Sequence, residues 1–267
     1  MVVRRERWLL YGVPLLCLLL LAGGWFLGRE RLPTSPPEQP KLVLYSGDDV
    51  RPAVEDIIQA FQRRYGIQVE VRYGPAEQLL DQLESTRAGD VFLPCDAYSS
   101  AKVERRGLAG YRRQVARLVP VIQVARGNPE NLTSLSDLAA PGIRVAVAEG
   151  QATAIGRITP ALFRKNTVPA EAIASNAVFK AEMASELGQA VAARRADAAV
   201  NWRPVALQYP LTEVVAIPAE SNIVAVVEAM VLSTASDPEQ ARLLVDFLGG
   251  PAAREAFARH HYDLVEP

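Results

Sequence analysis

A turn-rich segment, residues 46–49, carries the first side chains of the chain that could bind a ligand. Ser46, Gly47, Asp48 and Asp49 end a short apolar run and favour turns and helix N-caps. A serine hydroxyl and unpaired backbone N–H groups can hold an anion, whereas carboxylates that face a site favour a cation. Asp48 fits a turn, and Asp49 fits either a ligand contact or the N-cap of the next helix.

The elements that must position this segment are predicted on both sides of it. Leu42 to Tyr45 reads as a buried strand. From Val50 to Phe61 apolar residues recur at spacings of three and four, which is typical of an amphipathic helix, and Pro52 fits its first turn. Because open α/β sheets bind ligands beyond the carboxyl ends of their strands, we expect the loop from Ser46 to Val50 to contact any small ligand.

Three more candidate ligand contacts occur at comparable places. Thr153 lies in the first turn of a predicted helix, where its hydroxyl and the nearby N–H groups either hold an anion or cap the helix. Asn201 and Trp202 follow a predicted buried strand. Arg203 is interpreted as a solvent-facing side chain. Cys95 is interpreted as a small buried residue, because no histidine lies near it in the sequence to make it a nucleophile.

The composition excludes several classes of protein. The 267 residues are 49% hydrophobic, so the chain can bury one large core or two smaller ones. From residue 32 onward it carries 24 basic and 28 acidic side chains, a balance that does not indicate a nucleic-acid partner. The two cysteines offer no disulfide framework. His260 and His261 lack spaced partners, so we expect no metal site and no cofactor, and interpret the pair as a surface feature of the last helix.

The amino-terminal segment, residues 1–31, reads as a signal anchor. Three arginines precede an uncharged run of 21 residues from Trp8 to Gly28, which is long enough to cross a bilayer. The length favours an uncleaved anchor over a cleavable signal, and the basic cluster predicts that the folded part lies on the periplasmic or extracellular side. Residues 32–40 contain four prolines and are predicted to form an extended linker.

The remaining chain predicts an alternation of strands and helices. Strands are expected at 42–45, 68–73 and 90–93, each followed by a helix, and this order implies a parallel sheet with helices on both faces. A second unit follows, with strands at 118–124, 143–147, 198–200, 214–217 and 222–232. Its helices are expected at 134–138, 151–164 and 183–195, and two closing helices at 238–247 and 252–260.

In their order and spacing these segments resemble the substrate-binding proteins of ABC importers, of the two-lobed type II kind that includes molybdate- and tungstate-binding proteins. The resemblance covers Lys41 to about Leu264 and rests on LVLYSGDDVRPAVEDIIQAF, LLDQLESTRAGDVFLPCDA, ARLVPVIQVARGNP, IRVAVAEGQATAIGR, RRADAAVNW and LLVDFLGGPAAREAFARHHY. It implies an α/β fold of two lobes, each a mostly parallel sheet flanked by helices, joined by two crossing strands. Lobe 1 is expected at 41–118 plus 225–267, and lobe 2 at 119–224.

The departures from the family pattern concern the ligand. In the molybdate proteins a serine from each of the first two strand-helix loops helps to hold the oxyanion, and alignment of VEDIIQAF and LLDQLE places Asp49 and Ala76 there, with Glu77 beside the second. Each ionised carboxylate would repel a unit negative charge by roughly 4 kcal/mol at about 4 Å for an effective dielectric near 20. Asn201 and Trp202 stand where the family's strand leads to a tyrosine. Ser46 is left as a possible hydroxyl donor.

Three functions remain open. The first is capture of a molybdate- or tungstate-type oxyanion for delivery to ABC permease subunits, and the second is binding of ferric iron or another cation through Asp49 and Glu77. The third is a membrane-anchored solute sensor, held through residues 8–28. An enzyme is not expected, because the sequence has no nucleophile elbow and only two histidines. The folded part is expected to be a monomer.

Overall fold

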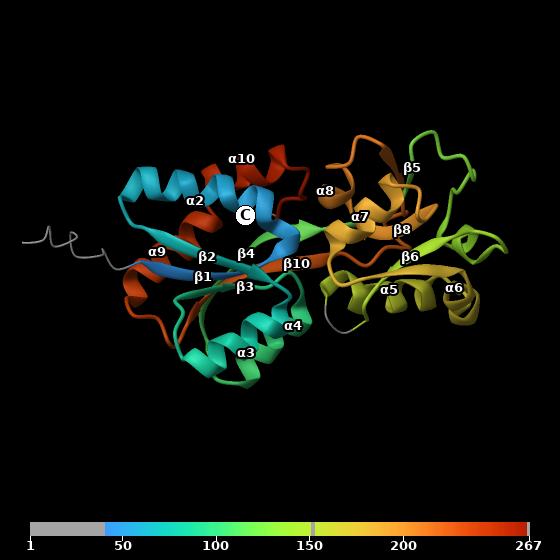
Figure 1. Ribbon diagram of the computed structural model, residues 1–267. Helices are drawn as coiled ribbons and strands as arrows, with labels where there is room; N and C mark the ends of the chain where they lie inside the picture. Colours follow the sequence, from blue (N-terminus) through green and yellow to red (C-terminus); the bar gives the residue numbers. More distant parts are fainter. Residues whose placement is uncertain (1–40, 151–152, 266–267) are drawn as a thin grey trace, which may run out of the picture. The chain divides into compact units, whose positions relative to one another are not determined.

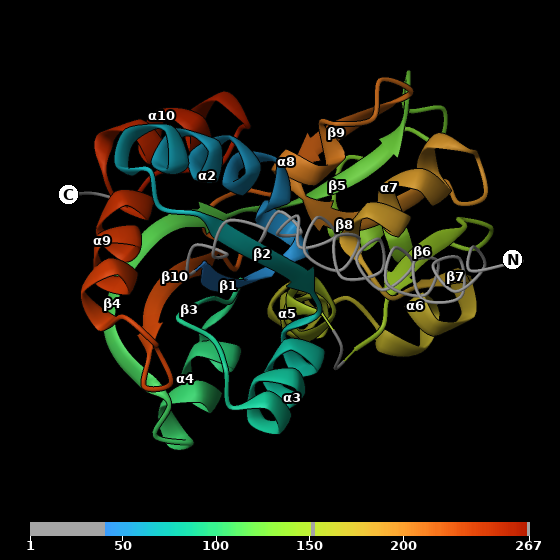
Figure 2. The ribbon, with the colours of Figure 1, turned by 60° about the vertical axis from the view of Figure 1, so that its left-hand side comes forward.

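The computed structural model describes residues 41–150 and 153–265, which belong to one compact unit that begins at Lys41. Two five-stranded sheets organise it, and Figures 1 and 2 show helices on both faces of each sheet. The two-lobed α/β fold expected from the sequence is confirmed. The predicted anchor at 8–28 and linker at 32–40 lie outside the described residues.

The first sheet combines parallel and antiparallel strands. It has the order β2-β1-β3-β10-β4, with β1 parallel to β2 and β3, and β10 antiparallel to β3 and β4. Its strands are β1 (Leu42–Gly47), β2 (Val69–Gly74), β3 (Val91–Leu93), β4 (Ala109–Leu118) and β10 (Ala225–Leu232). Its helices are η1 (Asp48–Val50), α2 (Arg51–Tyr65), α3 (Ala76–Thr86), α4 (Ala97–Arg105), α9 (Pro238–Leu248) and α10 (Pro251–Arg259).

The second sheet has the order β7-β6-β8-β5-β9, with β6 parallel to β7 and β8, and β5 antiparallel to β8 and β9. Its strands are β5 (Pro120–Ala125), β6 (Val145–Ala148), β7 (Ala177–Ala181), β8 (Ala198–Trp202) and β9 (Thr212–Ala216). Its helices are η2 (Leu135–Ala139), α5 (Ala154–Lys165), α6 (Ala170–Asn176), α7 (Ala184–Ala192) and α8 (Arg203–Ala206).

The chain passes from the first sheet to the second after Leu118 and returns to the first at Ala225. The lobe boundaries predicted at 118/119 and 224/225 fall at these passages and stay a prediction. Strands far apart in the sequence therefore lie side by side: β10 lies between β3 and β4 in the first sheet, and β5 lies between β8 and β9 in the second. The turns that follow β1, β2 and β3 emerge from the same edge of the first sheet, because these three strands are parallel.

Alternation along the strands explains the two helical layers of the first sheet. Leu44 packs in the hydrophobic core cluster that contains the buried face of α2, whereas the next residue, Tyr45, packs with Leu80 of α3. The apolar stripe of α2 is buried as its sequence spacing predicts, and Gly66 ends that helix with a φ of 71°. Each face of the sheet is thereby covered.

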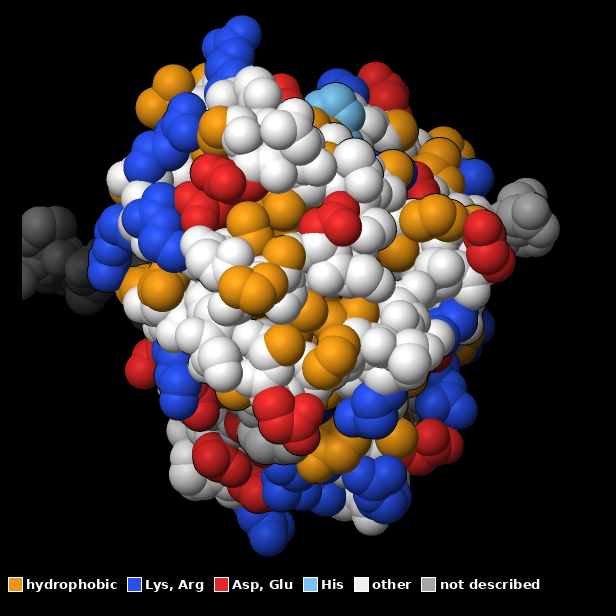
Figure 3. Space-filling view, turned by 90° about the vertical axis from the view of Figure 1, so that its right-hand side faces the viewer, with side chains coloured by type: hydrophobic (Ala, Val, Ile, Leu, Met, Phe, Trp, Pro, Cys, Tyr) orange, Lys and Arg blue, Asp and Glu red, His pale blue; other side chains and the backbone are white. Residues whose placement is uncertain are grey.

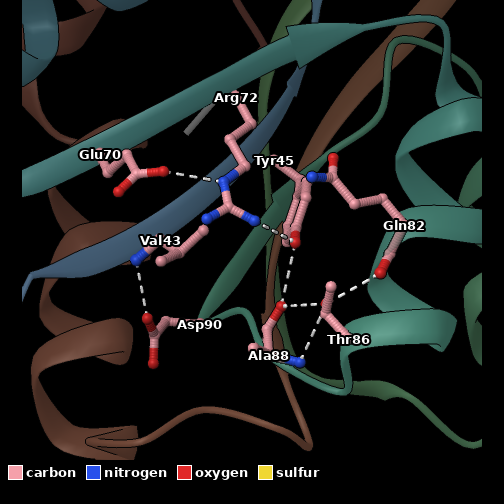
Figure 4. A network of polar contacts seen from close by, with 8 residues as sticks. All are labelled: Val43, Tyr45, Glu70, Arg72, Gln82, Thr86, Ala88 and Asp90. Carbon is pink, nitrogen blue, oxygen red and sulfur yellow. Dashed lines mark hydrogen bonds and ion pairs between the residues drawn. The ribbon is translucent and has the colours of Figure 1, made fainter.

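Polar contacts fix β1 between its neighbours. Figure 4 shows the Tyr45 hydroxyl donating to the Ala88 carbonyl at 3.1 Å and accepting from Arg72 of β2 at 2.9 Å. The Asp90 carboxylate accepts from the Val43 N–H at 2.7 Å in the same view. These contacts hold β1 and β2 in register with the start of β3. They therefore fix the positions of the turns that follow these strands.

Several elements differ from the sequence expectation. β4, α6, β7 and α8 were not predicted, α5 begins at Ala154 rather than at 151, and β10 begins at Ala225 rather than at 222. β4 and β7 each lie at the edge of a sheet, where one side lacks a neighbouring strand and apolar periodicity is weak. Each mostly parallel sheet contains one reversed strand: β10 is antiparallel to β3 and β4 in the first sheet, and β5 is antiparallel to β8 and β9 in the second.

Figure 3 shows the molecule from the side that Figure 1 draws on its right, where the second sheet lies. Hydrophobic side chains gather near the middle of this face, and charged side chains of both signs lie around them. Exposed large apolar residues of this half of the chain include Val178, Leu207 and Leu211. Isolated exposed apolar side chains are normal on soluble proteins and carry no functional argument by themselves.

Candidate functional site

A cavity of about 30 Å³ lies between turns of the two sheets. That volume exceeds the roughly 10–15 Å³ that one water needs, so it suits a compact ligand of a few heavy atoms. Five turns or helix starts line it: Gly47, Asp48 and Asp49; Gly74, Pro75 and Ala76; Cys95; Thr153, Ala154 and Arg157; and Glu182, Met183 and Ala184. The first three groups lie at or just after the ends of β1, β2 and β3, and the last two lie around the starts of α5 and α7.

Helix starts supply backbone donors to this cavity. α3, α5 and α7 have their N-caps at Pro75, Thr153 and Met183, and all three caps line the cavity. The first N–H groups of a helix have no partner inside it and, with the helix dipole, favour an anion. The Thr153 hydroxyl accepts from the Gly156 N–H at 3.0 Å, so the predicted capping role of Thr153 is observed. Its proposed ligand contact stays a prediction.

Two glycines allow the lining segments to approach one another. A Cβ on Gly47 would come within 2.4 Å of the Cys95 sulfur, and one on Gly156 within 2.2 Å of the Glu149 carbonyl oxygen. The first approach brings the turn after β1 against the turn after β3. The second packs the start of α5 against the end of the β6 segment. Cys95 is buried, as expected, and burial raises the pKa of its thiol.

Asp49 lies in the cavity wall but does not cap a helix. The N-cap of α2 is Val50, and no side chain caps it, because Asp49 lies inside the short helix η1, one residue before that N-cap. The predicted N-cap role of Asp49 is therefore wrong. Asp49 is half-buried, and burial, followed by the negative charge of Asp48, raises its pKa from 3.8 to about 7. The indole of Trp202 and the charge of Arg157 act in the opposite direction.

The other two aspartates near the cavity have cationic partners. Asp48 pairs with Arg51 at 2.7 Å. Asp96, buried at the start of α4, accepts from the Ser99 N–H at 2.7 Å and from Arg157 Nε at 2.9 Å. Because Asp96 follows a strand of the first sheet and Arg157 lies in α5 of the second half, this ion pair joins the two sides of the cavity.

The structure separates the eight predicted site residues into two groups. Gly47, Asp49, Ala76 and Thr153 line the cavity. Glu77 pairs with Lys102 of α4 and is absent from the described lining, so the expected pair of carboxylates facing the site is not formed there. The buried Ser46 hydroxyl donates to the Gly47 carbonyl at 3.1 Å, so its predicted place at the ligand is also not seen among the lining residues.

Asn201 and Trp202 lie behind the cavity wall. The Asn201 amide donates to Gln123 Oε1 at 2.8 Å and to the carbonyl of Ala184, a lining residue, at 3.1 Å. Asn201 therefore positions the start of α7. Trp202 is fully buried. Its indole N–H lies close enough to Asp49 to lower the pKa of that carboxyl, yet makes no hydrogen bond of acceptable geometry with any described residue.

Sequence reasoning missed several lining residues. The Gly74-Pro75 pair carried a signal, because it ends a predicted strand at the same sheet edge as Gly47. Met183 was the predicted start of a helix but was not singled out as a ligand contact, and Arg157 and Glu182 carried no signal, because β7 was not predicted and the side of α5 that faces the first sheet depends on tertiary packing. A larger groove of about 260 Å³ shares Asp48, Asp49, Met183 and Ala184 with the cavity. It gives the cavity a side that opens toward solvent.

Neither a metal cluster nor a membrane helix occurs in the described ranges. Across residues 41–150 and 153–265, no three His, Cys, Asp or Glu side chains gather so as to hold a metal ion. The helices of these same ranges are too short or too polar to cross a bilayer.

Comparison with known proteins gives consistent matches. Residues 42–263 match the bacterial extracellular solute-binding protein family. The chain is 27% identical over 257 residues to the molybdate-binding protein ModA of Mycobacterium tuberculosis (strain ATCC 25618 / H37Rv), covering 93% of this chain and 95% of that protein.

Solved structures share the fold at low identity. The periplasmic molybdate-binding protein of Azotobacter vinelandii has a TM-score of 0.71 at 18% identity, covering 85% of this chain and 100% of that one. The iron-bound HitA of Pseudomonas aeruginosa has a TM-score of 0.69 at 18% identity, covering 84% and 85%. One fold thus accompanies two very different ligands, so the ligand must be argued from the residues of the site.

Proposed function

The chain belongs to the bacterial extracellular solute-binding protein family, and from this premise we propose that it captures a small tetrahedral oxyanion of the molybdate or tungstate type for an ABC importer. The observation that carries the proposal is the cavity of about 30 Å³ at the starts of α3, α5 and α7. Its size suits a compact ligand, and its backbone donors suit a negative one. The full-length similarity to a molybdate-binding protein supports the same ligand.

The carboxylates of the site are compatible with an anion for two reasons. Asp48 and Asp96 each have an arginine partner, Arg51 and Arg157, so their charges are largely offset. Asp49 has a pKa raised to about 7, so near neutral pH a large fraction of this carboxyl is uncharged. The repulsion of an anion by Asp48, Asp49 and Asp96 is therefore reduced.

The cation alternative has less support from the geometry. It needs Asp49 and Glu77 together, whereas Glu77 is engaged by Lys102 of α4. The binding test accordingly includes ferric iron and divalent cations, so that a cation ligand would be detected.

The binding test is a thermal-shift and calorimetric screen of the full-length chain in mild detergent. The ligands are molybdate, tungstate, sulfate, phosphate, ferric iron and divalent cations, each alone. We expect molybdate and tungstate to raise the unfolding temperature, because a ligand at 100 times its dissociation constant adds about 2.7 kcal/mol of stability. Stabilisation by iron or a divalent cation alone, or by none of the oxyanions, overturns the oxyanion proposal.

Residues 8–28 are proposed to anchor the chain, with the folded unit outside the cytoplasm. The family match supports export, and the 21 uncharged residues after three arginines support retention in the membrane. The test is alkaline extraction of membranes from cells that produce the full chain, with a version starting at Lys41 as the control. Release of the full chain into the supernatant, or its cleavage near residue 30, contradicts an anchor.

Delivery to ABC permease subunits is the proposed use of the captured ligand. Uptake of molybdate by cells that carry the chain with a neighbouring permease and ATPase tests it, and loss of uptake on deletion is expected. Unchanged uptake together with an altered transcriptional response to the ligand would favour the sensor alternative.

A further inference from the structure

Asp49 differs from the neighbouring aspartates, Asp48 and Asp96, because no described cation forms an ion pair with it. Arg51, the nearest arginine in sequence, bonds to Asp48, and Arg157 bonds to Asp96 and to the Ser99 hydroxyl. Asp49 nevertheless lines the cavity. A ligand in that cavity therefore meets a carboxyl group whose charge is not offset by a salt bridge.

The groups around Asp49 favour its neutral form. Burial raises the pKa of the Asp49 carboxyl most and Asp48 and Asp96 raise it further, whereas the Trp202 indole and Arg157 lower it. The titratable or charged side chains that face Asp49 or share its cavity are Asp48 of η1, Arg51 of α2, Cys95 and Asp96 after β3, Arg157 of α5, Glu182 before α7 and Tyr262 after α10. The Tyr262 hydroxyl donates to the backbone carbonyl oxygen of Asp49 at 2.8 Å.

The buried indole of Trp202 adds a second observation. Its nitrogen is a donor only, is fully buried, and has no hydrogen-bond partner of good geometry among the described residues. It is near enough to the Asp49 carboxyl to lower the pKa of that group, by less than burial raises it. A buried donor of this kind calls for an acceptor, and one Asp49 oxygen can serve as one whether the carboxyl is ionised or neutral. That contact would leave the Asp49 O–H to point at a ligand in the cavity.

Resting on the proposed oxyanion function, we propose that Asp49 binds the ligand as a neutral carboxylic acid, so that capture of an oxyanion without a proton of its own takes up one proton from solvent. The Asp49 carboxylate gains the proton, and the resulting O–H donates to a ligand oxygen. No other bond forms or breaks. Asp49 thereby sets the specificity of the site for ligands that accept hydrogen bonds.

The coupling predicts how affinity depends on pH. Molybdate and sulfate carry no proton near neutral pH, so their binding requires a protonated Asp49. Their affinity falls about tenfold per pH unit once Asp49 ionises in the free protein, above about pH 7, and is level below it. Hydrogen phosphate brings a proton that it can donate to an ionised Asp49, so its affinity changes much less between pH 8 and 9.

The experiment is calorimetric titration of the full-length chain with molybdate from pH 6 to 9, in pairs of buffers with different ionisation enthalpies. We expect uptake of about one proton per molybdate at pH 8 to 9. Asp49→Asn, whose amide donates at every pH, should bind with no proton uptake and with level affinity. Asp49→Ser, which keeps a hydroxyl donor, provides a second variant if the asparagine variant does not fold. Glu77→Gln is the matched control and should keep the wild-type slope.

Two results overturn the coupling while leaving the proposed function intact: molybdate binding by the wild type with level affinity from pH 6 to 9, or an unchanged pH slope in both Asp49 variants. Failure of every oxyanion to bind the wild type at any pH overturns the proposed function and this inference together. The two failures are therefore distinguishable.

Discussion

Asp49 and Asp96 occupy similar places in the fold, yet only Asp96 caps a helix and forms an ion pair. Asp49 follows β1 and precedes α2, and Asp96 follows β3 and precedes α4, so each lies between a strand of the first sheet and the helix after it. Asp96 caps α4 and binds Arg157, whereas Asp49 lies inside η1 and its side chain caps no helix. Asp96 is thus held as a charged structural group, and Asp49 remains available to respond to pH and ligand.

The difference shows that position relative to a strand end does not determine the role of a carboxylate. What decides it is whether a helix N-terminus and a cation lie within reach. At Asp96 both are present, because its carboxylate accepts from the Ser99 N–H at the start of α4 and from Arg157. At Asp49 burial and the Asp48 charge dominate, and they favour the protonated form.

The largest expected effect comes from breaking the buried pair. Arg157→Met leaves the Asp96 carboxylate buried with its cap but without its cation. Removing one partner of a buried ion pair costs about 3–5 kcal/mol, so the free energy of unfolding without ligand should fall by that amount. Urea denaturation at pH 7.5 measures the loss.

Arg112→Met is the control, because Arg112 and Glu104 form an exposed pair whose loss costs about 0–1 kcal/mol. Adding Asp96→Asn to Arg157→Met should recover part of the loss, since the asparagine keeps the cap without a buried charge. Equal costs for Arg157→Met and Arg112→Met would show that the Asp96–Arg157 pair is not structural.

The second effect sharpens the comparison through pH. The folded-state pKa of Asp49, about 7, lies above its ordinary value of 3.8, so its contribution to stability is complete at low pH and is lost as pH rises through 7. Asp49→Asn removes this loss. The variant should exceed the wild type by about 1–3 kcal/mol at pH 8.5 and match it near pH 4.

Urea denaturation of both proteins from pH 4 to 8.5 gives the difference directly. The pKa values of Asp56, Asp137 and Asp197 are lowered, so these groups affect stability at lower pH and equally in both proteins. A difference that stays constant from pH 4 to 8.5 would place the Asp49 charge in an ordinary solvated environment.

The sequence predicts the buried strands and helices of the fold better than its edge strands. The order β1-α2-β2-α3-β3-α4 followed from apolar periodicity, because these strands and helices bury a continuous stripe or run. β4 was missed because Arg112, Arg113 and Arg117 interrupt its alternation, and as an edge strand it has a neighbouring strand on one side only. β7 is short and lies at the edge of the second sheet.

The candidate site was predicted where it depends on local structure and missed where it depends on packing between distant segments. Gly47, Asp49, Ala76 and Thr153 lie at strand or helix ends that the sequence locates. Arg157 and Met183 reach the cavity only because α5 and α7 of the second sheet face the first. The role of Asp49 was misjudged because a single turn of 3-10 helix cannot be distinguished from the first turn of α2 by apolar spacing.

The smallest expected effect concerns Glu77, the third carboxylate near a helix start. Glu77 and Lys102 are 30% and 20% exposed, so solvent screens their ion pair and Glu77→Gln should reduce the free energy of unfolding by about 0–1 kcal/mol. Because Glu77 is absent from the described cavity lining, Glu77→Gln should change molybdate affinity by less than about twofold, whereas Asp49→Asn should raise it by about tenfold or more at pH 8.5, where Asp49 of the free wild type is ionised. Calorimetry at pH 8.5 on the wild type, Glu77→Gln and Asp49→Asn makes the comparison. A tenfold gain in oxyanion affinity for Glu77→Gln would place that carboxylate at the ligand after all and remove the contrast with Asp49.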